Sequence, residues 1–338
     1  MQMNSTIIKE KAEFFGADLV GIAPIERFEG TGATEDPRHI APAAKSVIGL
    51  GFRVLRGSMR GIETGTEFFQ YPAMSIRNID CNIAPHTLRR VSCFLEDAGY
   101  EGVTLMAESD RCHADKPGIN PEGEDTQKYT AIPVAAGKPA PDVQIDFVQA
   151  AYLCGLGEIG MGGFFLTPDF GPLQRFAFIL TDAELEPDPV AVASLCDQCG
   201  KCAAACPGNA IIKEICERDW DGKKIPSWTL DEWQCSAYYS GCCSAMNPFL
   251  PPEALSSLPY ADELARGKKR LAPDEAIEVR NIVRKFYGGV GYNVAACICG
   301  KACQKECFIH LSENNLLKRQ FKNQFRTEPQ WRIAEKII

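Results

Sequence analysis

The chain of 338 residues has no long apolar run without charges. A membrane-spanning helix needs about 18 or more consecutive apolar residues, so the sequence predicts no membrane span. The first eleven residues also lack a basic stretch followed by an apolar run, and they contain no twin-arginine pair. Secretory and twin-arginine export signals have those features. We therefore expect a cytoplasmic protein with no membrane partner.

Positive charge is also scarce, because 44 acidic residues outnumber 36 basic ones and the formal net charge is −8. An acidic balance disfavours non-specific binding to nucleic acid or to a membrane surface. Internal repeats and low-complexity segments are absent apart from two groups of cysteines. The chain is 45% hydrophobic and 24% charged, which is typical of a globular protein with one large domain or two medium ones.

Cysteine, in contrast, is abundant, with 16 residues. In reducing cytoplasm such a count indicates metal sites rather than disulfides. The densest run is Cys196-x2-Cys199-x2-Cys202-x3-Cys206-Pro207, the spacing with which bacterial ferredoxins bind iron–sulfur clusters. In that arrangement three thiolates bind one cluster and the fourth binds a second. A zinc knuckle is the alternative, but zinc sites usually use two separated Cys-x2-Cys pairs.

The other ligands must come from cysteines further along the chain. Cys299, Cys303 and Cys307 recur every four residues, which on a helix places them on one face. Cys297 is an alternative to Cys299, and the roles of Cys242 and Cys243 stay open. We predict two 4Fe–4S clusters, one bound by Cys196, Cys199, Cys202 and Cys307 and the other by Cys206, Cys235, Cys299 and Cys303.

The patterns along the chain predict a mixture of helices and strands. Helices are expected at 4–15, 85–97, 147–156, 280–286 and 316–325, and strands at 19–23, 46–52, 103–106 and 175–181. Residues 53–80 are expected to be irregular, and 217–234 to form a connector. Residues 107–144 are rich in glycine, proline and charge, which is typical of a lid or binding loop. Residues 248–296 have the character of an insertion.

One segment carries a family resemblance. Residues 155–160 form a Gly-Leu-Gly-x-x-Gly turn, residues 167–172 a Thr-Pro-x-Phe-Gly-Pro element, and residues 181–182 a Thr-Asp end that precedes the cysteine run. This order resembles the segment shared by corrinoid-dependent reductive dehalogenases and epoxyqueuosine reductases. The sequences LVGIAP at 19–24 and AKSVIGL at 44–50 resemble their opening strands.

The resemblance implies an α/β (α+β) fold in two parts. The first is a nitroreductase-like core over residues 1–190, with 107–144 as a lid or insertion, which binds base-off cobalamin. The second is a C-terminal ferredoxin-like module over residues 191–312, which holds both 4Fe–4S clusters and contains the insertion at 248–296. A helical tail would follow at 313–338. No Asp-x-His-x-x-Gly corrinoid-ligating motif occurs, which agrees with the base-off mode. Flavin is an alternative cofactor for such a core.

The resemblance also suggests which residues bind the cofactor. Glycines without a Cβ would let the backbone approach a flat macrocycle, with a tight helix–strand turn as the alternative. Met161 departs from the pattern, because the families usually carry Lys or Arg there. The predicted cofactor-binding residues are Gly155, Gly157, Gly160, Gly162, Gly163 and Thr167.

Three residues are candidates for catalysis. Arg175 matches the families' arginine near the reacting centre, with a surface salt bridge as the alternative. Asp146 lies near the place of the aspartate proton donor of epoxyqueuosine reductases, but it could equally be a helix N-cap. Tyr71 is a further candidate. The dehalogenases' tyrosine donor is not found near Cys81 and Ile83, where counting back from Gly99 places it.

The function that follows is a cytoplasmic, cobalamin-dependent iron–sulfur reductase resembling reductive dehalogenases. It would pass electrons from a low-potential donor, such as ferredoxin or flavodoxin, through two clusters to the corrinoid and then to a small organic substrate, an organohalide being one candidate. A tRNA-modifying epoxyqueuosine reductase is an alternative, disfavoured by the acidic balance and by the missing helical-repeat tail. A non-catalytic electron-transfer or corrinoid-reducing partner protein is the other.

Overall fold

The computed structural model describes residues 3–32, 35–106, 132–141, 143–190, 194–251, 253–286, 296–325 and 333. Within these ranges a four-stranded sheet forms the centre of the N-terminal half, in the strand order β1-β2-β6-β3. The strands are β1 (Leu19–Pro24), β2 (Ser46–Arg53), β6 (Gln174–Thr181) and β3 (Gly102–Leu105), and each neighbouring pair is antiparallel. The mixed α/β class predicted from the sequence is confirmed.

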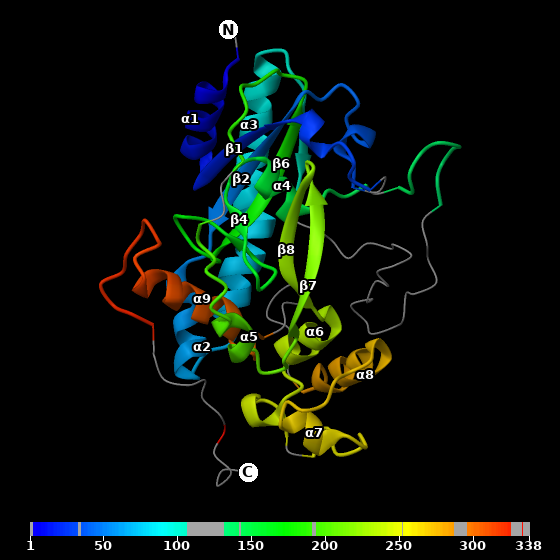
Figure 1. The fold of residues 1–338 in the computed structure, drawn as a ribbon, viewed down its shortest axis with the longest axis vertical. Helices are drawn as coiled ribbons and strands as arrows, with labels where there is room; N and C mark the ends of the chain where they lie inside the picture. Colours follow the sequence, from blue (N-terminus) through cyan, green and yellow to red (C-terminus); the bar gives the residue numbers. More distant parts are fainter. Residues whose placement is uncertain are drawn as a thin grey trace.

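Helices cover both faces of this sheet (Figure 1). On one face, α1 (Ser5–Phe15) and α3 (Ala84–Asp97) belong to the same buried hydrophobic cluster as Ile179 of β6. On the other, Phe147 of α4 (Phe147–Leu153) packs edge-on against Phe178, with ring centroids 4.9 Å apart. Successive residues of β6 thus enter different clusters, which is the pattern of a strand buried on both faces.

The first elements follow directly from the sequence. Asn4 accepts a hydrogen bond from the Ile7 N–H at 3.0 Å and caps α1, and Gly16 ends the helix at a φ of 121°. Strands β1, β2, β3 and β6 and helices α3 and α4 lie within a few residues of their predicted positions. Between β1 and β2 lie two short 3₁₀ helices, η1 (Ile25–Phe28) and η2 (Pro37–His39).

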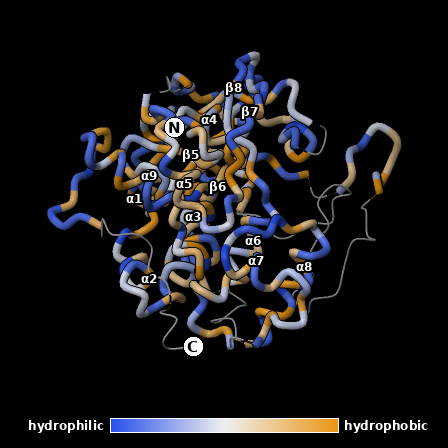
Figure 2. Tube along the Cα trace, turned by 60° about the horizontal axis from the view of Figure 1, so that its bottom comes forward, coloured by the Kyte–Doolittle hydropathy of each residue, from blue (hydrophilic) through white to orange (hydrophobic). Residues whose placement is uncertain are grey.

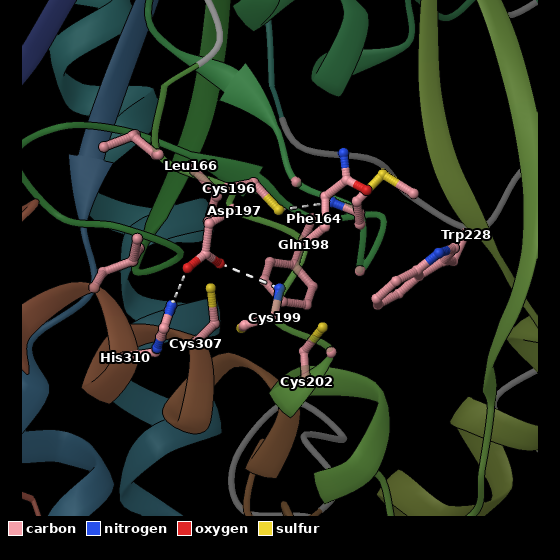
Figure 3. A pocket seen from close by; sticks show the side chains of 16 residues that line it. Phe164, Leu166, Cys196, Asp197, Gln198, Cys199, Cys202, Trp228, Cys307 and His310 are labelled. Carbon is pink, nitrogen blue, oxygen red and sulfur yellow. Dashed lines mark hydrogen bonds and ion pairs between the residues drawn. The ribbon is translucent and has the colours of Figure 1, made fainter. Parts of the chain in front are cut away.

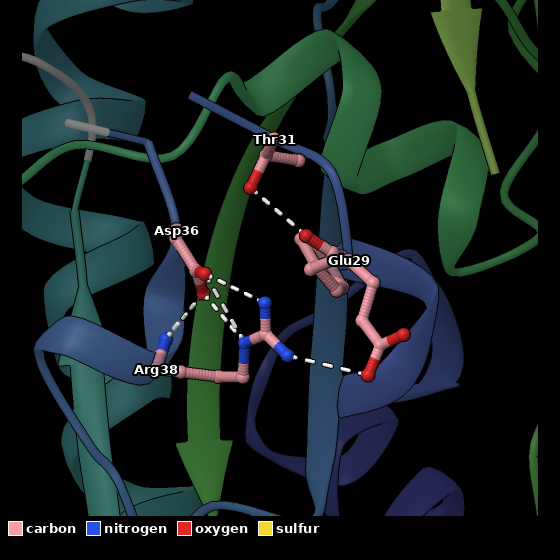
Figure 4. Close-up of polar contacts among 5 residues, drawn as sticks. Glu29, Thr31, Asp36 and Arg38 are labelled. Carbon is pink, nitrogen blue, oxygen red and sulfur yellow. Dashed lines mark hydrogen bonds and ion pairs between the residues drawn. The ribbon is translucent and has the colours of Figure 1, made fainter. Parts of the chain in front are cut away.

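A compact ion pair holds η2. Asp36 accepts hydrogen bonds from the Arg38 N–H and from the Arg38 guanidinium, which also reaches Glu29 (Figure 4). Thr31 donates to the Phe28 carbonyl beside them. Burial raises the pKa of Asp36, but the hydrogen bonds from Arg38 outweigh it and hold the pKa below its usual range.

The expectation of irregular chain at 53–80 is wrong. Residues 56–83 form short helical pieces: the 3₁₀ helix η3 (Arg56–Met59), α2 (Arg60–Thr64), and two π-helical turns, η4 (Tyr71–Arg77) and η5 (Ile79–Ile83), that run into α3. Single turns carry too little periodicity to be recognised in a sequence. Widened π turns inside helices are frequent at functional sites.

The connector expected at 217–234 is a β-hairpin instead. Its strands are β7 (Ile211–Trp220) and β8 (Lys223–Leu230), joined by Asp221 and Gly222 with φ of 53° and 69°. Positive φ at both turn residues is typical of a two-residue hairpin turn, for which Asp-Gly is a preferred sequence. A second small pair, β4 (Glu158–Ile159) and β5 (Phe165–Leu166), lies inside the glycine-rich segment.

The C-terminal half is mainly helical. Helices α6 (Glu232–Ser240), α7 (Ala261–Ala265) and α8 (Pro273–Val283) and the 3₁₀ helix η6 (Ser244–Met246) share a hydrophobic cluster of their own. The predicted insertion thus contains α7 and α8, and α8 begins seven residues before its predicted start. Helices α5 (Lys201–Ala205) and α9 (Ala302–Glu313) lie side by side near the sheet.

Two predictions concern the lid and the tail. Residues 107–131 and 142 of the predicted lid fall outside the described residues, and 132–141 contain neither helix nor strand. The helix expected at 316–325 is wrong, because α9 ends at Glu313 and Asn315 has a φ of 56°. The chain lies irregularly from there to Phe325.

Hydrophobic segments gather around α3 and β6 in the interior, while loops at the periphery are largely hydrophilic (Figure 2). None of the described helices combines the length and the apolar character that crossing a bilayer requires.

Candidate metal centre and adjoining polar cluster

The cysteine run begins in a loop that a buried carboxylate anchors. Glu158 of β4 is 3% exposed and accepts hydrogen bonds from the backbone N–H groups of Leu195 and Cys196, the latter at 2.8 Å. Gln198 and Gly200 both have positive φ, which turns the chain sharply between the cysteines. The glycine-rich segment and the cysteine loop are therefore one local structure.

Four cysteine side chains converge on one pocket (Figure 3). The pocket contains about 360 Å³ of empty space, including the part open to solvent, and its walls include Phe164, Leu166 and Trp228. Cys196 also accepts a hydrogen bond from the Met161 N–H at 3.3 Å. The four are Cys196 and Cys199 from the loop, Cys202 from α5 and Cys307 from α9.

These thiols oppose one another's ionisation. Burial, together with repulsion from the neighbouring Cys196 and Cys199, raises the pKa of Cys202 to about 11. Burial likewise raises the pKa of Cys307, with added repulsion from Cys202, Cys196 and Cys199. Four thiolates at such close quarters need a positive centre between them, and thiolate-rich sites select iron–sulfur clusters or zinc.

A histidine that the sequence did not single out joins this loop to α9. His310 and Asp197 form an ion-pair contact of 2.7 Å, and this hydrogen bond lowers the pKa of Asp197. One ligand-type atom from each of Asp197, Cys199 and His310 lies within 4.8 Å of the others. Because His310 lies one turn after Cys307 on α9, the helical spacing was the available signal.

A second set of cysteines lies deeper. Burial raises the pKa of Cys303 to about 12 and that of Cys235 to about 11. In both cases the charges of Cys299 and Cys206 contribute to this rise in pKa, so these four side chains share one neighbourhood. They come from three helices and a loop: Cys206 ends α5, Cys235 lies on α6, Cys303 lies on α9, and Cys299 precedes α9. The helix expected through all of 299–307 begins only at Ala302.

The three cysteines whose roles the sequence does not decide lie in two different places. Cys297 is fully buried and its thiol is hydrogen-bonded with that of Cys299, at the border of the second set. Cys242 and Cys243 are buried in the hydrophobic cluster of α6 to α8, where the Cys243 thiol donates to the Ala265 carbonyl at 3.0 Å.

A polar cluster adjoins the second set of cysteines. Arg175 of β6 donates to Asp80 of η5 at 2.5 Å. Burial raises the pKa of Asp80 above its usual value even though the Arg175 guanidinium opposes the shift. Burial also raises the pKa of Tyr71, to about 12, with Lys301 and Arg175 opposing. The cluster therefore holds a protonated phenol and a carboxyl whose pKa is raised by burial.

Lys301 carries positive charge into this region. Its ammonium lies 5.4 Å from the centre of the Tyr239 ring. Burial lowers the pKa of Lys301, but Tyr71 and the thiolates of Cys303 and Cys299 outweigh burial and raise it. The ammonium thus lies between the polar cluster and the second set of cysteines.

Of the predicted catalytic residues, the structure brings together Arg175 and Tyr71 but not Asp146. Asp146 accepts from the backbone N–H groups of Val148 and Gln149 at the start of α4, so the N-cap alternative is the correct one. Asp80 was missed by sequence reasoning. The signal was available, because counting back from Gly99 had pointed to the residues just after it.

The glycine turn packs closely against the protein's own backbone at two positions. A Cβ on Gly155 would lie 2.4 Å from the Pro189 carbonyl oxygen, and one on Gly157 would lie 2.1 Å from the Leu166 carbonyl oxygen. The protein's own backbone thus fills that space, and the helix–strand turn alternative is the correct one here. Gly160 lies against the Leu166 side chain in the same way.

Two of the remaining predicted cofactor residues, Thr167 and Gly162, also make close contacts within the protein. Thr167 is fully buried, where its hydroxyl donates to Gln174 and accepts from the Phe170 N–H. A Cβ on Gly162 would lie 2.6 Å from the Phe164 ring and 3.0 Å from the Cys202 sulfur, so Gly162 packs beside the first set of cysteines. Gly163 has a φ of 80° and stays uncrowded. Of the residues predicted to bind cobalamin, Gly155, Gly157 and Thr167 thus make close contacts within the protein.

One segment of the chain matches the model of a known protein family. Residues 189–212 match the family model of a 4Fe-4S binding domain, which covers the first cysteine run. The chain is thus similar to iron–sulfur proteins over this segment.

The particular relatives are tetrachloroethene reductive dehalogenases. That of Dehalobacter restrictus is 36% identical over 159 residues, which are 43% of this chain and 28% of that protein. That of Sulfurospirillum multivorans is 34% identical over 117 residues, which are 30% of this chain and 23% of that protein. The predicted resemblance to reductive dehalogenases is confirmed, although the matches span less than a third of the length of these relatives.

Solved structures give a weaker likeness. The catabolic reductive dehalogenase NpRdhA, in complex with 3-bromo-4-hydroxybenzoic acid, covers 86% of this chain and 39% of its own at 18% identity and a TM-score of 0.48. Epoxyqueuosine reductase from Bacillus subtilis covers 92% of this chain and 82% of its own at 16% identity and a TM-score of 0.44. All of these relatives and neighbours are reductases. TM-scores below 0.5 do not establish a shared fold.

Proposed function

We propose that the chain is a cytoplasmic iron–sulfur oxidoreductase that carries two 4Fe–4S clusters and reduces a small organic substrate. The observation that carries the proposal is the gathering of eight cysteines into two groups of four. One group is Cys196, Cys199, Cys202 and Cys307, and the other is Cys206, Cys235, Cys299 and Cys303. The division into a core over 1–190 and a cluster module over 191–312 is part of the proposal.

The two groups are linked through two short helical stretches. Cys202 and Cys206 lie one turn apart at α5, and Cys303 and Cys307 lie one turn apart on α9. Each pair sends one thiol to each group. Bound clusters would supply one-electron transfer at low potential. The first group lies close to solvent, since Cys199 is exposed, whereas the second lies against the buried polar cluster.

The polar cluster of Tyr71, Asp80 and Arg175 would supply protons next to the second, buried group of cysteines. Reduction of an organic bond consumes protons as well as electrons, and a carboxyl with a raised pKa is a suited donor. Asp80 has that character, Arg175 fixes its orientation, and Tyr71 remains a neutral hydrogen-bond donor. The relatives support an organohalide as the substrate class, because they are dehalogenases of tetrachloroethene.

The resemblance also implies base-off cobalamin. Gly155, Gly157 and Thr167 make their close contacts within the chain and do not themselves support that group. An absorption spectrum of the anaerobically purified protein separates the cofactors: iron–sulfur clusters alone, added corrin bands, or flavin bands.

The experiment for the activity itself is chloride release. Protein with reconstituted clusters, reduced with dithionite, is incubated with tetrachloroethene in the presence and absence of cob(II)alamin. We expect chloride release above the protein-free control. Absence of chloride release under both conditions, with clusters intact and reduced, contradicts the proposed substrate class.

The filled glycine turn favours a second candidate, a non-catalytic electron-transfer protein that reduces another protein's corrinoid. The discriminating measurement is whether the reduced chain bleaches free cob(II)alamin stoichiometrically while it releases no chloride from tetrachloroethene. That outcome selects the second candidate.

A further inference from the structure

An open groove lies beside the first set of cysteines. It has a volume of about 580 Å³ and lies between the end of β2, the loop before β6, α9 and the chain that follows α9. Its walls include Leu55, Arg56, Phe170, Phe308, Arg319 and Phe321. None of these residues belongs to the polar cluster or to either set of cysteines.

Arginine and aromatic side chains are paired along this groove. The Arg56 guanidinium lies 4.1 Å from the centre of the Phe321 ring, and the Arg319 guanidinium lies 5.0 Å from that of Phe170. Stacking on a ring holds a guanidinium in place. One edge of each is partly used, because Arg56 donates to the Asn323 carbonyl and Arg319 lies 3.9 Å from Asp169. Leu55 and Phe321 are 53% and 47% exposed, so the groove presents apolar surface between the charges.

The surface around the groove is basic. Residues 53–60 and 318–322 carry six basic side chains, and three of the carboxylates around them form ion pairs, namely Asp18, Glu63 and Asp169. Across the described residues, neither Arg56 nor Lys322 forms an ion pair. The chain as a whole has a net charge of −8, so this local positive charge favours an acidic partner that binds here over non-specific binding to anions.

The groove is also next to the first metal site. Phe308 lines the groove, and its chain neighbour Cys307 lines the pocket of the first cysteine group. Cys199 of that group is exposed, so the group is the one that an external donor can approach.

We propose that this groove and its basic rim are the docking surface for an acidic electron-carrier protein that delivers electrons to the first cysteine group. The inference rests on the proposed function. Electron-transfer complexes use small interfaces and rely on charge complementarity for fast encounter, which a basic rim around an apolar centre provides. The exposed apolar centre and the overall acidity favour a protein over an RNA.

The probe is a reduced flavodoxin of net negative charge, and the signal is bleaching of the cluster absorbance in a stopped-flow instrument. For Arg56→Glu/Arg319→Glu we expect reduction roughly tenfold or more slower and less dependent on salt. The single substitution Lys322→Glu, at an exposed residue, should also slow cluster reduction. It tests the proposal even if the double variant misfolds. Lys45→Glu and Lys224→Glu are matched controls, since both lysines are exposed and outside the groove. They should leave the rate unchanged.

Two readouts separate this proposal from the proposed function. Dithionite bleaching and iron content report on the clusters, and calorimetric titration with oxidised flavodoxin reports on docking in any preparation. Unchanged rates and affinities in the groove variants, or equal losses in the lysine controls, overturn the proposal. It is also overturned if a tRNA stem-loop displaces flavodoxin and the groove variants lose salt-sensitive binding to that stem-loop.

Discussion

Asp80 and Asp146 show how much one contact decides about a residue's role. Both are carboxylates in the N-terminal half, and the sequence favoured Asp146. The Asp146 carboxylate accepts hydrogen bonds from the N–H groups that start α4, whereas Asp80 pairs with Arg175 beside a buried tyrosine. Only tertiary structure distinguishes the two, because Asp80 and Arg175 are 95 residues apart.

The first prediction contrasts these two carboxylates. Asp80→Asn should lower the rate of substrate reduction by about 100-fold or more while iron content is unchanged, because a proton donor is lost. Asp146→Asn is the control and should change stability slightly but not the rate, since asparagine also caps helices. Steady-state rates across pH provide the measurement, and equal rates for Asp80→Asn and the unmodified chain contradict the role of Asp80.

The second prediction concerns Lys301. Adding an electron to the second cluster adds negative charge, and a nearby ammonium stabilises that charge. Lys301→Met should therefore lower the reduction potential of the second cluster, measured by a redox titration followed by EPR. Lys45→Met, at the residue before β2, should leave the potential unchanged. A potential that stays constant or rises in Lys301→Met argues against this placement of charge.

The third prediction is a pH dependence at Asp36. The pKa of Asp36 is held below its usual value by Arg38, so the unfolded chain binds the proton more tightly than the folded chain. Its stabilising effect is present above the ordinary aspartate pKa of about 3.9 and is lost as the pH falls through the lower folded value. Denaturant midpoints of Asp36→Asn and the unmodified chain should differ at pH 7 and converge in acid. A constant gap between them rules this linkage out.

At the scale of elements, periodicity located the helices and strands that pack against the sheet. Helices α1 and α3 and strands β1, β2 and β6 have apolar residues at regular spacing or in short runs, so their positions could be predicted. The hairpin β7–β8 could not, because its exposed strand alternates weakly and only Asp221-Gly222 marks the turn. The π-helical turns η4 and η5 were missed because they have no period of their own, and they carry Tyr71 and Asp80.

The glycine-rich turn was recognised, but its purpose was not. The resemblance assigned Gly157 to a cofactor, while the structure places the Leu166 carbonyl where a Cβ would lie. A sequence shows that a glycine is needed but not whether a ligand or the chain itself approaches it.

The fourth prediction follows from that close approach. Gly157→Ala should destabilise the chain by about 1–3 kcal/mol, because the added methyl forces β5 to move. Gly57→Ala is the matched control, since a Cβ there meets nothing within 4 Å. Thermal unfolding of both variants gives the comparison, and an unaltered Gly157→Ala variant would show that the turn has free space above it.

At the scale of the whole molecule, cysteine spacing carried most of the functional information. The two groups of four that the structure gathers are those that the sequence suggested, although Cys206 and Cys303 of one group are 97 residues apart. Spacing succeeded because two thiols on one turn of α5 and two on one turn of α9 leave few ways to complete two sites. Substrate and electron donor have no such signature, because pockets and charged surfaces are assembled from distant segments.

The central claim is that these eight thiols hold two 4Fe–4S clusters, and anaerobic analysis of iron and acid-labile sulfide tests it most directly. We predict about eight irons and eight sulfides per chain, falling to about four of each in Cys202→Ser or in Cys303→Ser and staying at eight in the control Cys216→Ser, whose cysteine is exposed on β7. Zinc in place of iron, or about four irons in the unmodified chain, would contradict the account.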